Sequence, residues 1–195
     1  MINWLESIDR SLLLFINGIH TPFLDEIMWF FSGKLSLTPL YLILLFLIKK
    51  EYSWRNFGLI CFGVFLTILI ADQTSVHLFK EFFQRYRPSH NLEICNKLHF
   101  YETKPGEFYR GGTYGFISSH AANYFGMVGF ILPLFSKKYN WLKVFILVVG
   151  ITVGLSRVYL GVHYPSDVFL GAVIGLLIGW SIYYFLYRRY KFENV

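Results

Sequence analysis

Long apolar stretches alternate with short polar segments along the chain, and few charges interrupt the apolar stretches. A helix that crosses a bilayer needs about 20 predominantly apolar residues. The pattern therefore predicts about five such helices. Their approximate bounds are Ile27–Ile48, Phe57–Phe79, Ser119–Phe135, Trp141–Arg157 and Ser166–Tyr187. Gly33, Lys34 and Pro39 interrupt the first. The predicted fold is all-α, a polytopic integral membrane helix bundle.

The N-terminal segment, residues 1–22, has a different pattern. Its residues Trp4–Asn17 place apolar side chains on one face of a helix and polar ones on the other, which is typical of a helix lying in the membrane interface. The segment lacks the basic start and long apolar run of a signal peptide. We expect an N-terminal interfacial helix within a single membrane domain, residues 1–195.

Two further features of the pattern bear on packing and function. Gly171, Gly175 and Gly179 recur every fourth residue, so they share one face of a helix and permit close contact with a neighbour. The polar connection 84–117 is long and has no regular pattern, as is common for functional loops. We expect it to be an active-site loop.

Composition narrows the class of protein, and charge suggests an orientation. With 55% hydrophobic and 15% charged residues, the chain is neither disordered nor a nucleic-acid-binding tail. The net charge is nevertheless +6. Many of its basic residues crowd into short loops and helix ends, where they favour the cytoplasmic side: Lys49, Lys50, Arg55, Lys137, Lys138, Lys143, Arg188, Arg189 and Lys191. This assignment places loop 84–117 on the outer face.

Three polar clusters fall at helix ends on that outer face. In chain order they are Lys80 with Arg87-Pro88, Ser118-Ser119-His120, and Ser156-Arg157 with His163 and Asp167. If the helix continues past Lys80, the seven-residue spacing places Lys80 and Arg87 on one helix face.

Each cluster also has a purely structural interpretation. Lys80 and Arg87 are possible interface anchors, and His120 is a possible capping residue. His163 and Asp167 are spaced as a structural helix pair.

Together, however, the clusters supply what phosphoryl transfer needs. Cations and a helix N-terminus bind a phosphate oxyanion. A histidine with a carboxylate partner suits nucleophilic or general-base work, and a second histidine suits general-acid work. The residues favour transfer through a phosphohistidine.

The ordered motifs Lys80-x6-Arg87-Pro88, Ser118-Ser119-His120 and Ser156-Arg157-x5-His163-x3-Asp167 resemble the signature of the type 2 phosphatidic acid phosphatase family. That family shares its site with vanadium-dependent haloperoxidases. The resemblance covers about Phe57 to Tyr187. The second motif departs from the usual Pro-Ser-Gly-His, because Ser119 stands in place of glycine, and we expect altered geometry with retained activity.

The resemblance implies a role for each matching residue. His163 would attack phosphorus, Asp167 would accept the other ring N–H of His163, and His120 would protonate the leaving oxygen and then activate water. The phosphate-binding residues would be Lys80, Arg87, Ser118, Ser119 and Arg157. No metal and no cofactor are implied.

The resemblance further implies a metal-independent lipid phosphatase in the bacterial inner membrane, multi-pass, with its site on the periplasmic face. Its partners would be the lipid bilayer and a lipid phosphate substrate, with no nucleic acid. Undecaprenyl diphosphate or a lipid A phosphate is the favoured substrate, and phosphatidic acid and phosphatidylglycerol phosphate stay open. The alternatives are a non-enzymatic lipid-phosphate transporter or binder and a vanadate-dependent haloperoxidase-like enzyme.

Asp72 stands apart, because an ionisable residue inside a membrane helix is a candidate functional residue. We expect it to form a structural hydrogen bond near the site, and a functional role stays open.

Overall fold

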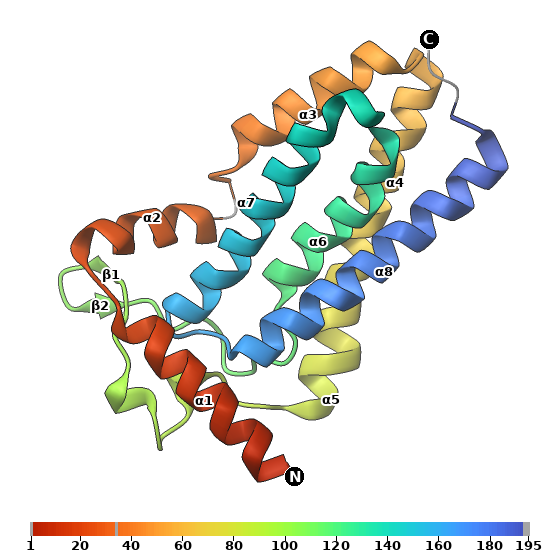
Figure 1. Cartoon of the computed structure of the whole chain (residues 1–195). Coiled ribbons are helices and arrows are strands. Elements are labelled where there is room, and N and C mark those ends of the chain that lie inside the picture. The colour runs from red at the N-terminus through yellow and green to blue at the C-terminus, as the bar shows by residue number, and fades with distance from the viewer. Residues whose placement is uncertain (1, 34, 193–195) are drawn as a thin grey trace.

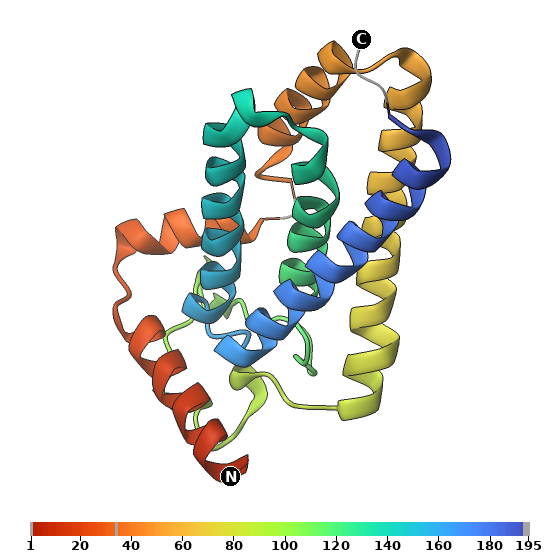
Figure 2. The same ribbon diagram turned by 45° about the vertical axis from the view of Figure 1, so that its right-hand side comes forward.

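The computed structural model describes residues 2–33 and 35–192 (Figure 1). Its long helices run side by side, with the N-terminus at one end of the bundle and the C-terminus at the other (Figures 1 and 2). The bundle comprises α4 (Trp54–Gln73), α6 (Ser119–Ile131), α7 (Asn140–Tyr159) and α8 (Pro165–Tyr190). Outward-facing side chains such as Phe62, Phe169 and Phe185 are apolar and exposed, as the lipid-facing surface of a membrane bundle requires.

Within the described residues, 3 helical segments are long and apolar enough to cross a membrane: Trp54–Phe83, Lys137–Tyr159 and Pro165–Tyr190. Helix α6 has 13 residues and continues into a 3-10 turn, Leu132–Leu134. At 1.5 Å per residue, α6 alone extends about 20 Å, less than the roughly 30 Å of a bilayer core. The helical membrane fold is confirmed, and the predicted count of five spans is not.

The predicted first span, Ile27–Ile48, is wrong, because this region forms two helices. They are α2 (Pro22–Ser32) and α3 (Thr38–Glu51). Gly33 ends α2 with an extended backbone, and Pro39 favours a new start because it lies in the first turn of α3. Lys34, part of the predicted interruption, lies outside the described residues. Helix α2 lies across the bundle, whereas α3 runs toward the end that holds the C-terminus (Figure 1).

Helix α4, predicted to end near Phe79, does not extend as far as Arg87. It passes through a π-helical segment, Thr74–Lys80, into α5 (Glu81–Phe83), and ends where Gln84 adopts a left-handed backbone with φ 45°. The condition under which Lys80 and Arg87 would share one helix face is therefore not met. Loop 84–117 carries Arg87 instead, and the Arg87 N–H donates to Thr113 O at 3.0 Å near the other end of that loop.

Loop 84–117 has little regular structure of its own. It contains two 3-10 turns, Pro88–His90 and Cys95–Lys97, and a short antiparallel hairpin of β1 (Glu102–Lys104) and β2 (Glu107–Phe108).

The glycine face predicted on α8 is confirmed as a close contact with α6. An added Cβ would lie 2.7 Å from Ser118 O at Gly171, 2.2 Å from Ala122 O at Gly175 and 1.9 Å from Gly126 O at Gly179. No side chain fits at these distances. The small residues let the two backbones approach, and this fixes the start of α6 beside the start of α8.

Helix α1 (Ile2–Gly18) covers the end of the bundle that holds the starts of α6 and α8 (Figure 1). It buries Leu13 and Asp9 and exposes Trp4 and Phe15, and it confirms that this segment is helical. The Asn17 amide ties its end to the bundle by donating to Tyr159 O at 2.7 Å.

Candidate active site

The three sequence clusters meet at one end of the bundle. Lys80 ends the π-helical segment, His120 lies in the first turn of α6, and Arg157 lies in the last turn of α7. His163 occupies the turn between α7 and α8, and Asp167 lies in the first turn of α8. The convergence predicted from the sequence is confirmed.

His163 and Asp167 face each other in a fully buried setting. His163 Nδ1 lies 3.5 Å from Asp167 Oδ2, and each side chain is 1% exposed. This distance is within ion-pair range but longer than a hydrogen bond. Catalytic hydrogen bonds are often long before substrate binds.

The contact with Arg87 identifies which ring nitrogen of His163 carries the lone pair. Its Nη1 lies 3.1 Å from His163 Nε2 and 3.3 Å from Val162 O. A guanidinium only donates, so Nε2 carries a lone pair, and the ring proton of the neutral imidazole lies on Nδ1, toward Asp167. This tautomer points a nucleophilic lone pair at a cation that can hold phosphate.

Electrostatics keep His163 uncharged and Arg87 charged. Burial, then Arg87 and Arg157, lower the pKa of His163 well below 6.5, so the ring is neutral at pH 7. Burial, then Arg157, lower the pKa of Arg87 to about 10, so that side chain still carries its charge. Neutral imidazole beside fixed cations is the state that attack on a phosphoryl group requires.

Lys80 and Ser119 form a second polar contact at the site. Lys80 Nζ donates to Ser119 Oγ, and that oxygen is also 2.6 Å from Ser75 Oγ. The hydroxyl of Ser119, the residue that departs from the usual motif, therefore holds the ammonium in place.

Two of the predicted phosphate-binding residues are buried and do not line the cavity beside the other three. Ser118 is fully buried, and its Oγ accepts from Ala121 N at 3.4 Å as the N-cap of α6. Arg157 is 1% exposed, and it donates to Ser32 Oγ and, at 2.9 Å, to Tyr109 Oη. Both lie behind the residues that line the cavity.

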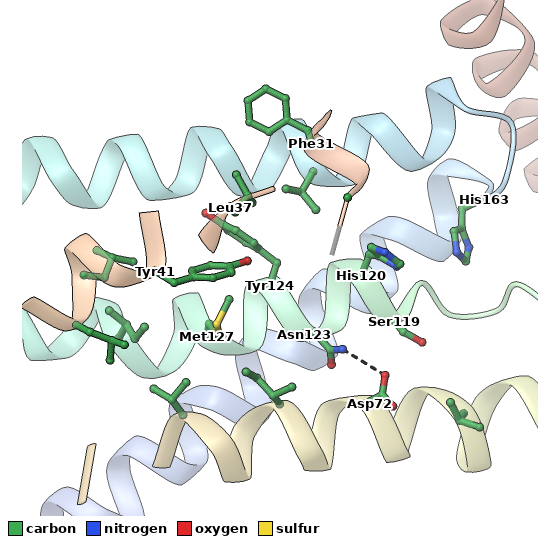
Figure 3. Close-up of a pocket in the computed structure, with 18 of the residues that line it drawn as sticks. Phe31, Leu37, Tyr41, Asp72, Ser119, His120, Asn123, Tyr124, Met127 and His163 are labelled. Carbon is green, nitrogen blue, oxygen red and sulfur yellow. Dashed lines mark hydrogen bonds between the residues drawn. The ribbon is translucent and has the colours of Figure 1, made fainter. Parts of the chain in front are cut away.

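That cavity has a volume of about 660 Å³ and reaches from the polar residues deep between the helices. At one end lie His163, His120 and Ser119, and at the other lie Leu37, Tyr41 and Met127 (Figure 3). A polar end followed by an apolar length fits a phosphate attached to a lipid.

Sequence reasoning missed a charged network behind Asp167. Arg85 Nη1 donates to Asp167 Oδ1 at 2.8 Å and to Ser166 Oγ at 2.9 Å, and Arg85 Nη2 donates to Asp9 Oδ2 at 2.7 Å. Asp9 Oδ1 also accepts from Ser166 N at 2.8 Å. Arg85 could have been suspected as a site residue, because it lies two residues before Arg87 in the sequence. No sequence pattern around Asp9 indicates that it contacts the site.

These features define a membrane protein built to transfer a phosphoryl group from a lipid. Comparison with known proteins agrees. The model of the PAP2 superfamily matches residues 58–191. The chain belongs to the PAP2 superfamily and is a lipid phosphatase. The resemblance stated from the motifs is confirmed.

Two relatives match nearly the whole chain. The lipid A 4'-phosphatase of Bacteroides thetaiotaomicron is 38% identical over 189 residues, which cover 96% of this chain and 81% of that protein. The lipid A 4'-phosphatase of Porphyromonas gingivalis is 35% identical over 190 residues, covering 96% and 77%.

The fold also matches a crystal structure of a PAP2-type phosphatidylglycerolphosphate phosphatase from Bacillus subtilis. The TM-score is 0.68 at 26% identity, and the match covers 98% of this chain and 90% of that one. Together with the membrane-spanning helices, these relatives identify an integral membrane enzyme. The non-enzymatic transporter or binder considered from the sequence is therefore wrong.

Proposed function

We propose that this enzyme removes the 4'-phosphate of lipid A through a covalent phosphohistidine on His163. Two relatives named as lipid A 4'-phosphatases support the substrate, since both match 96% of this chain. The observation that carries the mechanism is the contact between His163 Nε2 and Arg87 Nη1 at 3.1 Å, with Asp167 on the other side of the ring.

The first half of the reaction forms a nitrogen–phosphorus bond. The His163 Nε2 lone pair attacks phosphorus, and the bond from phosphorus to the sugar oxygen breaks. His120, which takes up a proton when the phosphate dianion binds, donates that proton to the leaving oxygen. Asp167 stabilises the positive charge that develops on His163.

The second half returns the enzyme to its starting state. The now neutral His120 takes a proton from water, the water oxygen attacks phosphorus, and the nitrogen–phosphorus bond breaks. Inorganic phosphate leaves, and His120 releases its proton to water. Throughout, Lys80, Arg87 and the Ser119 amide would hold the phosphoryl oxygens, while Arg157 and Ser118 would support them from behind.

We further propose that the protein lies in the bacterial inner membrane with the site on the periplasmic face, and that α1 lies in the membrane interface. The basic short loops and helix ends support this orientation. Loop 84–117 supplies its test. A cysteine introduced at the exposed Lys104, with Cys61 and Cys95 replaced by serine, should react with an impermeant maleimide in spheroplasts. Labelling only after lysis would reverse the orientation.

The experiment for the activity uses the purified protein in detergent micelles with lipid A, measuring released phosphate. We expect turnover by the wild type and none by His163→Ala. His77→Ala is the matched control, because His77 is exposed and pairs with Glu81 rather than with the site. Turnover by His163→Ala at the wild-type rate would refute the mechanism, and an inactive wild type would refute the substrate.

A further inference from the structure

The cavity contains a polar pair that the catalytic steps do not use. Asp72 on α4 and Asn123 on α6 both line it, and Asn123 Nδ2 donates to Asp72 Oδ1 at 3.2 Å. Figure 3 shows Asn123 between His120 and Met127, and Asp72 facing Asn123 from α4. Asp72 is the one carboxylate among the described residues that line the cavity.

The pair has hydrogen-bond acceptors to spare. Asn123 Oδ1 is buried and has no hydrogen-bond partner among the described residues. The opposite amide orientation would turn this oxygen toward the Asp72 carboxylate, so the present orientation is the favourable one. Because a carboxylate only accepts, Asp72 Oδ2 is a second acceptor at the same place.

The position of the pair matches the part of a substrate that joins phosphate to chain. Asn123 lies one helical turn beyond His120, and Asp72 lies eight residues before Lys80. A carboxylate repels phosphate, so the Asp72 side chain beside Asn123 suits the neighbouring groups of the substrate rather than the phosphate itself. Those groups must be hydrogen-bond donors.

We propose that Asp72 and Asn123 form a subsite that accepts hydrogen bonds from hydroxyl or amide N–H groups beside the substrate phosphate. This inference rests on the proposed function and sharpens it. The acylated glucosamine units of lipid A carry amide N–H and hydroxyl donors within a few bonds of the phosphate. A polyprenyl phosphate carries none, since its phosphate is attached directly to hydrocarbon. The subsite therefore selects glycolipid phosphates over polyprenyl phosphates.

The test compares kcat/KM on lipid A and on undecaprenyl diphosphate, each in mixed micelles. Asn123→Leu removes one acceptor and the partner of Asp72 while keeping the side-chain volume similar. We expect it to lower the preference for lipid A, the ratio of the two kcat/KM values, by about twofold to tenfold, as loss of a hydrogen bond between neutral groups does. Asp72→Asn keeps an acceptor oxygen, so we expect a smaller loss of preference.

Asn140→Leu is the matched control, since Asn140 is exposed at the start of α7, outside the cavity lining. An equal fall on both substrates would show a structural role for Asn123 and overturn the inference. An unchanged preference would overturn it too, as would a wild type that prefers undecaprenyl diphosphate. A wild type inactive on both lipids would refute the proposed function first and the inference with it.

Discussion

Arg85 offers a sharp test of how the buried charges stabilise the site. Its guanidinium joins Asp9 on α1 to Asp167 on α8, with hydrogen bonds of 2.7 and 2.8 Å. The Asp9 and Asp167 side chains are 7% and 1% exposed. Replacing Arg85 with methionine keeps much of the side-chain length but leaves two buried carboxylates without this cation.

The expected cost follows from burial. Removing one partner of a buried ion pair costs about 3–5 kcal/mol, because the remaining charge stays out of water. For a chain of this size, each kcal/mol shifts the melting temperature by roughly 2–4 °C. We therefore expect Arg85→Met to melt about 6–20 °C below the wild type. In Arg85→Lys the ammonium can reach only one carboxylate at a time. Its melting temperature should therefore lie between those of Arg85→Met and the wild type.

The assay is thermal unfolding in detergent, followed by intrinsic fluorescence, with kcat and KM on lipid A measured well below the transition. Arg85 acts on Asp167 rather than on substrate, so we expect kcat to fall more than KM rises. Arg189→Met is the control, since Arg189 is exposed in the last turn of α8 and its loss should cost at most about 1 kcal/mol. An Arg85→Met protein with the melting temperature and kcat of the wild type would refute the reasoning.

Further predictions concern packing, pH and inhibitors. Gly179→Ala should destabilise the protein by about 1–3 kcal/mol, because the added Cβ would meet the α6 backbone. Gly58→Ala is the control, since an added Cβ there has no atom within 4 Å. Equal melting temperatures of the two variants would contradict the close contact. The pKa of His163 lies below 6.5 and its neutral form reacts, so kcat/KM should hold from pH 7 to 6.5 and fall only at lower pH; an acid limb centred above 6.5 would contradict this. Excess EDTA should leave phosphate release unchanged, and a strong loss would point to a metal. Vanadate should inhibit competitively, and support of halide oxidation by vanadate would favour the haloperoxidase alternative.

The motifs could be read from the sequence because they use local spacing at helix ends. His163 lies just before α8 and Asp167 lies in its first turn, and their four-residue spacing predicted that they pair. The glycine spacing of α8 predicted its close contact with α6 for the same reason. In both cases residues close together in the sequence determine the result.

Other features depend on contacts that local patterns do not encode. Apolar residues continue through the break after Gly33, so hydropathy merged α2 and α3 into one span. The π-helical segment before Lys80 and the left-handed Gln84 leave no periodic signal in an apolar helix. Asp9 and Asp167 are brought together only by folding, so neither could be assigned to the other from the sequence.

The direct test of the account is a covalent intermediate on His163. In His120→Ala the second step lacks its base, so the phosphoenzyme should accumulate. p-Nitrophenyl phosphate needs little help from an acid, because its leaving group is stable as an anion. We expect a burst of about one p-nitrophenol per enzyme, and a phosphate that is acid-labile, alkali-stable and located on His163 by mass spectrometry. Absence of both the burst and the modified histidine, while the wild type turns over, would contradict nucleophilic attack by His163.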